Sequence, residues 1–394
     1  MKTDDRLASG VPHLLWVYGE SLNRKLDAAT WLETSNRLCE LGWRVTLAAA
    51  APGSHRRIGQ VEVRYFPKPP VYLLRHIVFH LTLAWYLMHY WSDVDVILFH
   101  PASAFWLLPL FIFTSLIGSR RPWFVMDTRD LNPPGGTLKN RVRVQFYRLM
   151  HSLASYWTDG QTTITQRMAD LVKIPPQKLW GVWPSGVNPQ EFAPAQRRRR
   201  WPADGEPIHL VYVGVLLPER NLLPLSEAVE AANAEGMSFT LSLVGGGAER
   251  AKLEGFARGT GERVRVVPPV PHDEVVDWLA KAHVGVTSMF DADQTIFQAS
   301  SPIKLFEYLA AGLPILAPHL ACYGDVIGDG EFAIWVDYPD AAGILASLRQ
   351  VWQKRDTLEG MGALAASAAQ AWTWAASAEK LKRALERGIR AHAQ

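Results

Sequence analysis

Cysteine is nearly absent from this 394-residue chain: Cys39 and Cys322 stand alone, without a Cys-x-x-Cys pair or a zinc-ligand spacing. A disulfide-stapled fold and a cysteine-based metal site are therefore excluded. No uninterrupted apolar run reaches the roughly 20 residues that a membrane-spanning helix needs. The residues before Val11 are polar and charged, so no secretory signal is predicted. These absences predict a protein of the reducing cytoplasm.

The overall composition is that of a globular protein, with 48% hydrophobic and 20% charged residues. This balance excludes a disordered or fibrous chain, and the length is sufficient for two domains with separate cores.

Charge is divided unevenly along the chain. Residues 1–200 hold 25 Lys and Arg against 14 Asp and Glu, whereas residues 201–394 hold 16 against 24. A basic first half predicts an anionic partner, either nucleic acid or an acidic membrane. The chain also has 16 Trp. Trp and Tyr near basic residues are favoured at a membrane interface, so we expect an anionic membrane surface and no nucleic acid.

The first residues predict alternating strands and helices. An apolar run at 13–18, a helical period at 30–41 and a second apolar run at 45–47 give the order strand, helix, strand. This order predicts a parallel sheet with right-handed crossovers and a ligand site at the carboxyl ends of its strands. The loop after Gly19 is expected at that edge, unless it is only a connection between strand and helix.

Two further strands end in residues suited to chemistry. The apolar run 94–100 ends at His100, and the run from Trp123 is followed by Asp127, Arg129 and Asp130. Charges at the carboxyl edge of a parallel sheet suit recognition or catalysis, although a structural salt bridge is the alternative.

Two apolar segments, 71–91 and 104–118, are predicted as helices. Both fit core helices of the first domain. Alternatively, one of them rests in a bilayer interface, with Arg120 and Arg121 on the lipid headgroups. A basic helix with Arg141, Arg143 and Arg148 among apolar residues follows.

The second half repeats the alternation. A strand at 208–214 leads through a loop to a helix at 224–234, and a strand ends at Gly245. Residues 299–318 then predict a small-residue loop, a helix from Pro302, a stop at Gly312 and a buried strand. The start of such a helix can bind phosphate. Lys304 and Glu307 share one face of this helix. Either they are ligands for a phosphate and for hydroxyl groups, or they form an ordinary surface ion pair.

Residues 299–318 resemble the donor-site signature of the retaining glycosyltransferases of family 4, also called glycosyl transferases group 1. The likeness is strong at 181–192 and 208–318 and loose at 1–150. It implies an α/β fold of the GT-B type, with two Rossmann-like domains whose parallel sheets face a central cleft. Two positions depart from the family pattern: Ala299 replaces a Glu and Val215 replaces an Arg.

The resemblance also implies roles for individual residues. Glu307 would bind the ribose, and Arg220 and Lys304 the donor diphosphate. The remaining expected donor-site residues are Gly214, Gly245, Val270, His272, Ser301 and Pro302. The expected catalytic group is His100, Asp127, Arg129 and Asp130, and the expected acceptor-binding residues are Gly19, Glu20, Asn23 and Arg24. No metal and no cofactor are expected; Asp291-Ala292-Asp293 resembles a metal motif but precedes no matching strand.

We therefore expect an N-terminal acceptor-side domain at 1–190, a linker at 191–206 with a solvated Arg197–Arg200 run, and a nucleotide-sugar domain at 207–374. A C-terminal helix at 375–394 would pack back on the first domain. The expected activity is retaining transfer of a sugar from a UDP- or GDP-linked donor to a lipid-linked glycan, by a peripheral enzyme on the inner face of the cell membrane. Alternatives are an inverting transferase with Asp127 or Asp130 as base, and a catalytically weak nucleotide- or glycan-binding subunit.

Overall fold

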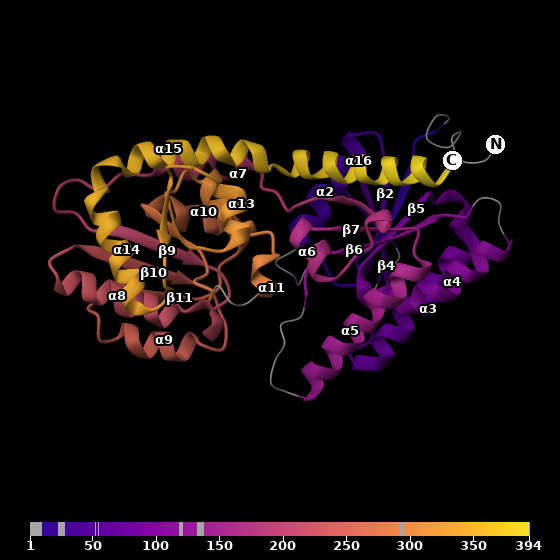
Figure 1. Cartoon of the computed structure of the whole chain (residues 1–394), viewed down its shortest axis with the longest axis horizontal. Coiled ribbons are helices and arrows are strands. Elements are labelled where there is room, and N and C mark those ends of the chain that lie inside the picture. Colours follow the sequence, from indigo (N-terminus) through magenta and orange to yellow (C-terminus); the bar gives the residue numbers. More distant parts are fainter. Residues whose placement is uncertain are drawn as a thin grey trace. The chain divides into compact units, whose positions relative to one another are not determined.

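The chain forms two compact units in a computed structural model, which describes residues 10–22, 28–51, 53, 55–117, 121–131, 138–291 and 295–393. Unit 1 comprises Met1–Ser185 and Trp374–Gln394, and unit 2 comprises Gly186–Thr373 (Figure 1). The expected linker at 191–206 holds most of helix α7 (Pro189–Arg198), which packs within unit 2 against α10 (His272–Lys281).

Unit 1 is built on a sheet with the strand order β3-β4-β2-β1-β5-β6-β7-β8 in the described residues. Only the pairing of β3 with β4 is antiparallel, at the edge of the sheet. The strands are β1 (His13–Val17), β2 (Arg44–Ala50), β3 (His55–Ile58), β4 (Val61–Phe66), β5 (Val96–Phe99), β6 (Trp123–Thr128), β7 (Gly160–Thr163) and β8 (Leu179–Val182).

Both faces of this sheet are covered. Along β1, Leu14 and Trp16 enter one apolar core, and Leu15 and Val17 enter the other, because successive side chains of a strand alternate between faces. The helices of unit 1 are α2 (Ala28–Glu40), α3 (Tyr72–Tyr90), α4 (Ala104–Ile117), α5 (Leu138–Trp157), α6 (Gln166–Leu171) and α16 (Trp374–Ala393). The first core includes α16, and the second includes α3, α4 and α5.

Unit 2 repeats the plan with a parallel sheet in the order β11-β10-β9-β12-β13-β14. Its strands are β9 (Ile208–Val213), β10 (Phe239–Val244), β11 (Val264–Val267), β12 (Val284–Val286), β13 (Ile315–Pro318) and β14 (Ala333–Val336). Besides α7 and α10, its helices are α8 (Leu222–Ala234), α9 (Arg250–Ala257), α11 (Thr295–Gln298), α12 (Ile303–Ala310), α13 (Ala321–Ile327), α14 (Ala341–Gln353) and α15 (Leu358–Ala368).

The last helix, α16, belongs to unit 1 although it follows unit 2 in the sequence. It packs against α2 and β8, and Arg387 donates a hydrogen bond to the Trp180 carbonyl at 2.6 Å. The two segments that connect the units are paired, since the Val187 N–H donates to the Trp372 carbonyl at 2.9 Å.

The two apolar segments of the first half are helices, α3 and α4. Neither they nor any other helix in the described ranges combines the length and apolarity needed to cross a membrane.

Candidate functional site

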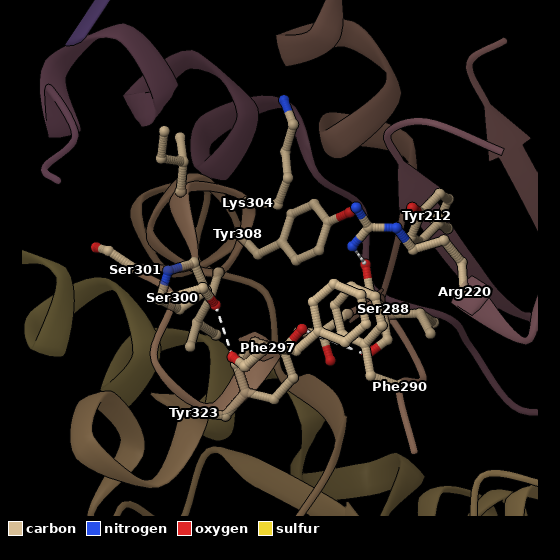
Figure 2. A pocket seen from close by; sticks show the side chains of 15 residues that line it. Tyr212, Arg220, Ser288, Phe290, Phe297, Ser300, Ser301, Lys304, Tyr308 and Tyr323 are labelled. Atoms are coloured by element: carbon tan, nitrogen blue, oxygen red, sulfur yellow. Dashed lines mark hydrogen bonds between the residues drawn. The ribbon is translucent and has the colours of Figure 1, made fainter. Parts of the chain in front are cut away.

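A pocket of about 270 Å³ lies beyond the carboxyl ends of strands in the unit 2 sheet (Figure 2). In parallel α/β sheets this edge is where ligands bind. Four of the residues predicted for the donor site line it: Arg220, Ser301, Pro302 and Lys304. The other lining residues are Tyr212, Val286, Thr287, Ser288, Phe290, Phe297, Ser300, Ile303, Leu305, Tyr308 and Tyr323.

Arg220 is held rigidly at the wall of this pocket. It ends a short 3-10 turn, Pro218–Arg220, and the left-handed conformation of Asn221 (φ 50°) turns the chain into α8. Its guanidinium donates to the Ser288 hydroxyl at 2.9 Å and lies 4.2 Å from the centre of the Phe290 ring. The buried Nε has no hydrogen-bond partner among the described residues. A planar cation with an unused donor suits a phosphate oxygen.

Lys304 and Glu307 form an ion pair near the start of α12, with 2.9 Å between Nζ and Oε2. The Lys304 side chain is 39% exposed, whereas that of Glu307 is only 6% exposed. This pair therefore differs from the solvated surface pair that was the alternative, because one partner is inside the protein. Figure 2 shows Lys304 extending from the start of α12, and the Arg220 guanidinium pointing toward Ser288. The positive end of the α12 dipole adds to the positive potential that Arg220 and Lys304 create in the pocket.

Three tyrosines, Tyr212, Tyr308 and Tyr323, line the site, and no pattern in the sequence pointed to them. The Tyr308 hydroxyl accepts a hydrogen bond from the Val213 N–H at 2.8 Å, and the Tyr323 hydroxyl donates to the Ser288 carbonyl at 3.3 Å. Burial raises the pKa of Tyr308 and of Tyr323 well above that of a free tyrosine. Burial also raises the pKa of Tyr212. These side chains therefore remain neutral hydrogen-bonding groups at physiological pH.

Ser288, Phe290 and Phe297 were also missed. Phe290 and Phe297 stack with 3.6 Å between ring centroids, and Phe290 supports the Arg220 guanidinium. The sequence did contain a signal for Ser288 and Phe290, because they belong to the polar and aromatic run that directly follows the buried strand β12. Residues that follow a parallel strand lie at the edge of the sheet where ligands bind. Their contact with Arg220 arises because β12 is the neighbour of β9 in the sheet.

Gly214 and Gly245 lie together where β9 and β10 end, outside the pocket lining. The Gly214 N–H donates to the Val244 carbonyl at 3.0 Å. A Cβ on Gly245, whose φ is +154°, would lie 1.8 Å from the Gly214 carbonyl oxygen. These glycines allow two backbone segments to approach each other closely.

Glu307, Val270 and His272 also lie outside the residues that line the pocket. Val270 is half-buried after β11, and His272 is exposed at the first turn of α10, with its ring 6.2 Å from that of Phe192. The structure thus brings together Arg220 and Lys304, the cations predicted for the donor phosphates, whereas these three positions are not part of the pocket lining.

In unit 1, Asp127 is completely enclosed at the end of β6. Its Oδ1 accepts hydrogen bonds from the Thr162 hydroxyl at 2.6 Å and the Trp183 indole at 3.0 Å. The Arg129 Nη1 lies 4.0 Å from the Asp127 Oδ2, and the Arg129 guanidinium carbon is 3.5 Å from the centre of the Trp183 ring. Burial raises the pKa of Asp127, and Arg129 opposes this shift. For Asp127 and Arg129, this geometry fits the structural salt bridge that the sequence offered as the alternative to a role in recognition or catalysis.

His100 and Asp130 form a second pair, at the carboxyl edge of β5 and β6. The His100 Nε2 lies 2.9 Å from the Asp130 Oδ1, and its Nδ1 accepts from the Ala102 N–H at 3.3 Å. This arrangement places the ring proton on Nε2, facing the carboxylate. Asp130 is 81% exposed, so this pair, unlike Asp127, is accessible from solvent.

Two of the predicted acceptor residues, Gly19 and Glu20, lie beside Lys68. The Lys68 ammonium is 3.1 Å from the Glu20 carboxylate and donates to the Gly19 carbonyl. Lys68 had no distinguishing pattern in the sequence. Asn23 and Arg24 lie outside the described residues.

In the ranges that the structure covers, no three His, Cys, Asp or Glu side chains come close enough to bind a metal ion. The Ala292 and Asp293 of the Asp-x-Asp motif are not among the described residues.

Residues 207–354 match the family model "Glycosyl transferases group 1". The chain is 26% identical over 256 residues to a D-inositol 3-phosphate glycosyltransferase of Thermobispora bispora, covering 61% of this chain. The match spans 58% of that relative's length.

Two solved structures are similar over almost their whole length. Sucrose-phosphate synthase from Thermosynechococcus elongatus has a TM-score of 0.75 at 16% identity, covering 97% of this chain and 100% of that one. Anabaena HepE in complex with UDP has a TM-score of 0.69 at 13% identity, covering 95% and 99%. These likenesses establish the fold, and the predicted α/β GT-B architecture with two parallel-sheet domains is confirmed.

Proposed function

We propose that this chain is a glycosyltransferase that moves a sugar from a nucleotide-sugar donor to a glycan acceptor. The observation that carries the proposal is the pocket of unit 2, where Arg220 and Lys304 accompany the start of α12 at the carboxyl edge of a parallel sheet. The match of residues 207–354 to a glycosyltransferase family model supports it, because the pocket lies within that range.

The donor diphosphate would occupy the space between the two cations. Arg220 offers a planar fork of N–H donors, including the unpaired Nε, and Ser288 and Phe290 fix its orientation. Lys304 offers a more mobile point charge, and Ser300 and Ser301 line the same wall. An anionic diphosphate is the ligand class that these donors fit.

The Glu307 carboxylate would accept hydrogen bonds from the ribose hydroxyls. A second role is already visible: Glu307 orients Lys304 through their 2.9 Å ion pair. Holding the nucleoside and the phosphate ligand from one helix would fix the distance between them, which favours a single bound pose.

In the reaction, the bond between the anomeric carbon of the sugar and the leaving phosphate oxygen would break, and negative charge would develop on the diphosphate. The acceptor hydroxyl oxygen would bond to the same carbon, and its proton would pass to the departing diphosphate. Arg220 and Lys304 would stabilise that charge in the transition state. None of the described residues that line the pocket is Asp or Glu, so no carboxylate is available there as a nucleophile. If the configuration is retained, the transfer would therefore proceed by front-face substitution, without a covalent glycosyl-enzyme intermediate.

We propose UDP- or GDP-sugars as donors and a lipid-linked glycan, such as a polyprenyl diphosphate glycan, as acceptor. The enzyme would act in cell-surface polysaccharide or glycolipid synthesis, at the cytoplasmic face of the membrane. The excess of basic residues in the first 200 residues supports an anionic acceptor on that side of the enzyme.

A second candidate is an inverting transferase in which Asp130 acts as the general base. It is favoured by the exposed His100–Asp130 pair, whereas the enclosed Asp127 has no access to an acceptor hydroxyl. The anomeric configuration of the product, determined by NMR, separates the two: retention removes the inverting candidate, and inversion removes front-face substitution.

The test of donor binding is the thermal stabilisation of the purified chain by UDP, GDP, ADP and their sugars. A ligand at about 100 times its dissociation constant adds roughly 2.7 kcal/mol to the free energy of unfolding, which a melting scan resolves. Arg220→Ala and Lys304→Ala should each remove the shift, whereas Arg258→Ala, an exposed arginine of the same unit, should retain it. No shift with any nucleotide in the wild type would contradict the proposal, and Ala299 and Val215 would then mark a lost donor site.

A further inference from the structure

Helices α3, α4 and α5 of unit 1 expose many large apolar side chains. α4 contacts both α3 and α5, and the three helices lie together in Figure 1. Their other faces form the apolar core under the sheet. The exposed apolar residues are Leu74, Leu81, Trp85, Met88 and Tyr90 on α3, Phe105, Ile112, Phe113, Leu116 and Ile117 on α4, and Leu138, Val142, Phe146, Leu149, Leu153 and Tyr156 on α5. We call this set the α3–α5 surface.

On α5 the exposed apolar residues form a continuous stripe. From Val142 to Tyr156 they are spaced alternately by four and three residues, so they share one face of the helix. Their exposed fractions range from 39% to 83%. A different face, with Met150 and Ala154, enters the core. The stripe is therefore a second apolar face that packing within the unit does not require.

The charges on these helices have one sign. The sequences of α3, α4 and α5 contain no Asp and no Glu. Arg141 and Arg148 are exposed and seven residues apart, so they lie on the same side of α5, next to the stripe. A surface that combines apolar side chains with helices whose own charges are all positive fits an anionic partner that also offers hydrocarbon.

The aromatic residues point to the same partner. Trp85, Tyr90 and Tyr156 are exposed at the surface, and Trp and Tyr are favoured at the boundary between lipid headgroups and acyl chains. A second copy of the chain is disfavoured, because a symmetric contact through α5 would bring the arginines of both copies together. Exposed apolar surface of this extent is unusual for a protein without a partner.

We infer that the α3–α5 surface lies on an anionic lipid bilayer, with α5 in the plane of the interface. The stripe would enter the headgroup and acyl boundary, and Arg141 and Arg148 would contact lipid phosphates. No described helix can span a bilayer, so the contact is peripheral. This inference concerns a surface of unit 1 and does not depend on the donor pocket of unit 2.

One expectation from the sequence changes. One of the two interpretations of the apolar segments placed Arg121 on headgroups together with Arg120, but its guanidinium binds the Asp159 carboxylate through both terminal nitrogens, at 2.7 and 2.6 Å. It also lies 4.9 Å from the centre of the Phe111 ring. Arg121 is thus part of the fold, and the arginines of α5 are the ones positioned for lipid. Arg120 lies outside the described residues.

The test is flotation of the purified full chain with vesicles of phosphatidylcholine alone and of phosphatidylcholine mixed with phosphatidylglycerol. We expect binding to the anionic vesicles, reduced by salt, and much weaker binding to the zwitterionic ones. Each basic residue near an anionic surface contributes about fivefold to the partition coefficient, so Arg141→Glu/Arg148→Glu should lower it by on the order of 30-fold or more. Phe146→Ser/Leu153→Ser should lower it by at least about tenfold, because buried apolar area is lost.

Matched controls come from unit 2. Arg258→Glu/Arg355→Glu makes the same change in net charge, and Leu364→Ser replaces an exposed leucine. Both should bind vesicles as the wild type does. Circular dichroism melts of all variants establish that they are folded, and nucleotide-induced stabilisation should be unchanged in the α5 variants.

Wild-type protein that stays in the soluble fraction with anionic vesicles would overturn the inference. So would stripe variants that float as well as the wild type. A wild-type dimer that the Phe146→Ser/Leu153→Ser variant converts to a monomer, without vesicle binding by either, would assign the surface to a second copy instead.

Discussion

The Arg199 guanidinium donates a hydrogen bond to the Gly312 carbonyl at 2.7 Å, two residues after the end of α12. It also donates to the carbonyls of Ala311, Ala282 and Leu279, at 2.7 to 2.8 Å. The sequence predicted a solvated arginine run, which is wrong for this residue: Arg199 is 9% exposed. Burial lowers its pKa to about 10, so it remains charged at neutral pH. One side chain thus holds the carboxyl end of the helix whose other end lines the pocket.

Arg199→Ala should lower the free energy of unfolding by about 3 kcal/mol or more, because it leaves several buried carbonyls without a donor. Arg199→Lys should lose less, since it keeps the charge but not the planar fork. Urea unfolding measures both. The control is Arg198→Ala, which removes an exposed ion pair with Asp277 and should cost about 0.5 kcal/mol or less. Equal losses for Arg198→Ala and Arg199→Ala would contradict the structural role.

Gly245→Ala should destabilise the protein by about 2 kcal/mol or more, because the new Cβ would collide with the Gly214 carbonyl and φ is positive. Gly360→Ala is the control: a Cβ there meets nothing within 4 Å, and the residue lies in α15. It should stabilise the helix by roughly 0.5–1 kcal/mol. Urea unfolding of the two variants checks the contrast, and a neutral Gly245→Ala would show that β9 and β10 can separate at this edge.

The assignment of Glu307 to the ribose can be tested with a nucleotide that lacks both ribose hydroxyls. The wild type should bind a 2′,3′-dideoxynucleotide diphosphate about 10- to 100-fold more weakly than the ribonucleotide, as expected for lost hydrogen bonds to a charged group. Glu307→Ala should bind the two forms equally, because the acceptor of those bonds is gone. Isothermal titration calorimetry gives the four affinities. A variant that still prefers the ribonucleotide would place the ribose elsewhere, and Glu254→Ala serves as a control that should keep the preference.

Replacing Arg220 by Lys separates charge from geometry. Arg220→Lys should weaken nucleotide diphosphate binding by about tenfold, because a single ammonium replaces a fork that Ser288 and Phe290 hold in place. Arg220→Ala should weaken it further, since the charge is also lost. Calorimetry under identical salt conditions compares them. Full affinity in Arg220→Lys would mean that the fork makes no specific contact with phosphate.

His151 should make the protein less stable in mild acid. Burial lowers its pKa to about 4, and neither ring nitrogen has a hydrogen-bond partner among the described residues. Between the folded value and the ordinary value of about 6.5, the unfolded chain binds the extra proton, so stability falls as the pH falls. From about pH 7.5 to about pH 5 this group alone should cost on the order of 2 kcal/mol.

His151→Leu should therefore lose less stability over that pH interval than the wild type, as measured by urea unfolding at both pH values. Met150→Leu, a substitution at the neighbouring buried position without a titrating group, should show the wild-type pH dependence. The same dependence in His151→Leu would mean that this histidine is not the group responsible.

Much of the fold could be predicted because its signals are local. The apolar runs that became β1, β6, β9 and β13, and the glycine and proline stops between them, depend on neighbours in the sequence. Lys304 also has a local signal, because it lies in the first turn of a helix that the sequence predicts, whereas Arg220 was expected from the family resemblance. The alternation of strand and helix then placed the start of that helix at one edge of a parallel sheet.

The sequence alone therefore determined the two α/β sheets and the helix start that carries Lys304 at the edge of the second one. Only the tertiary structure decided which polar residues are inside. Asp127 and Asp130 are three positions apart, yet one is enclosed by Thr162 and Trp183 and the other is exposed. Ser288 reaches Arg220 because β12 and β9 are neighbours in the sheet. Burial and partners depend on segments distant in the chain, which local periodicity cannot encode.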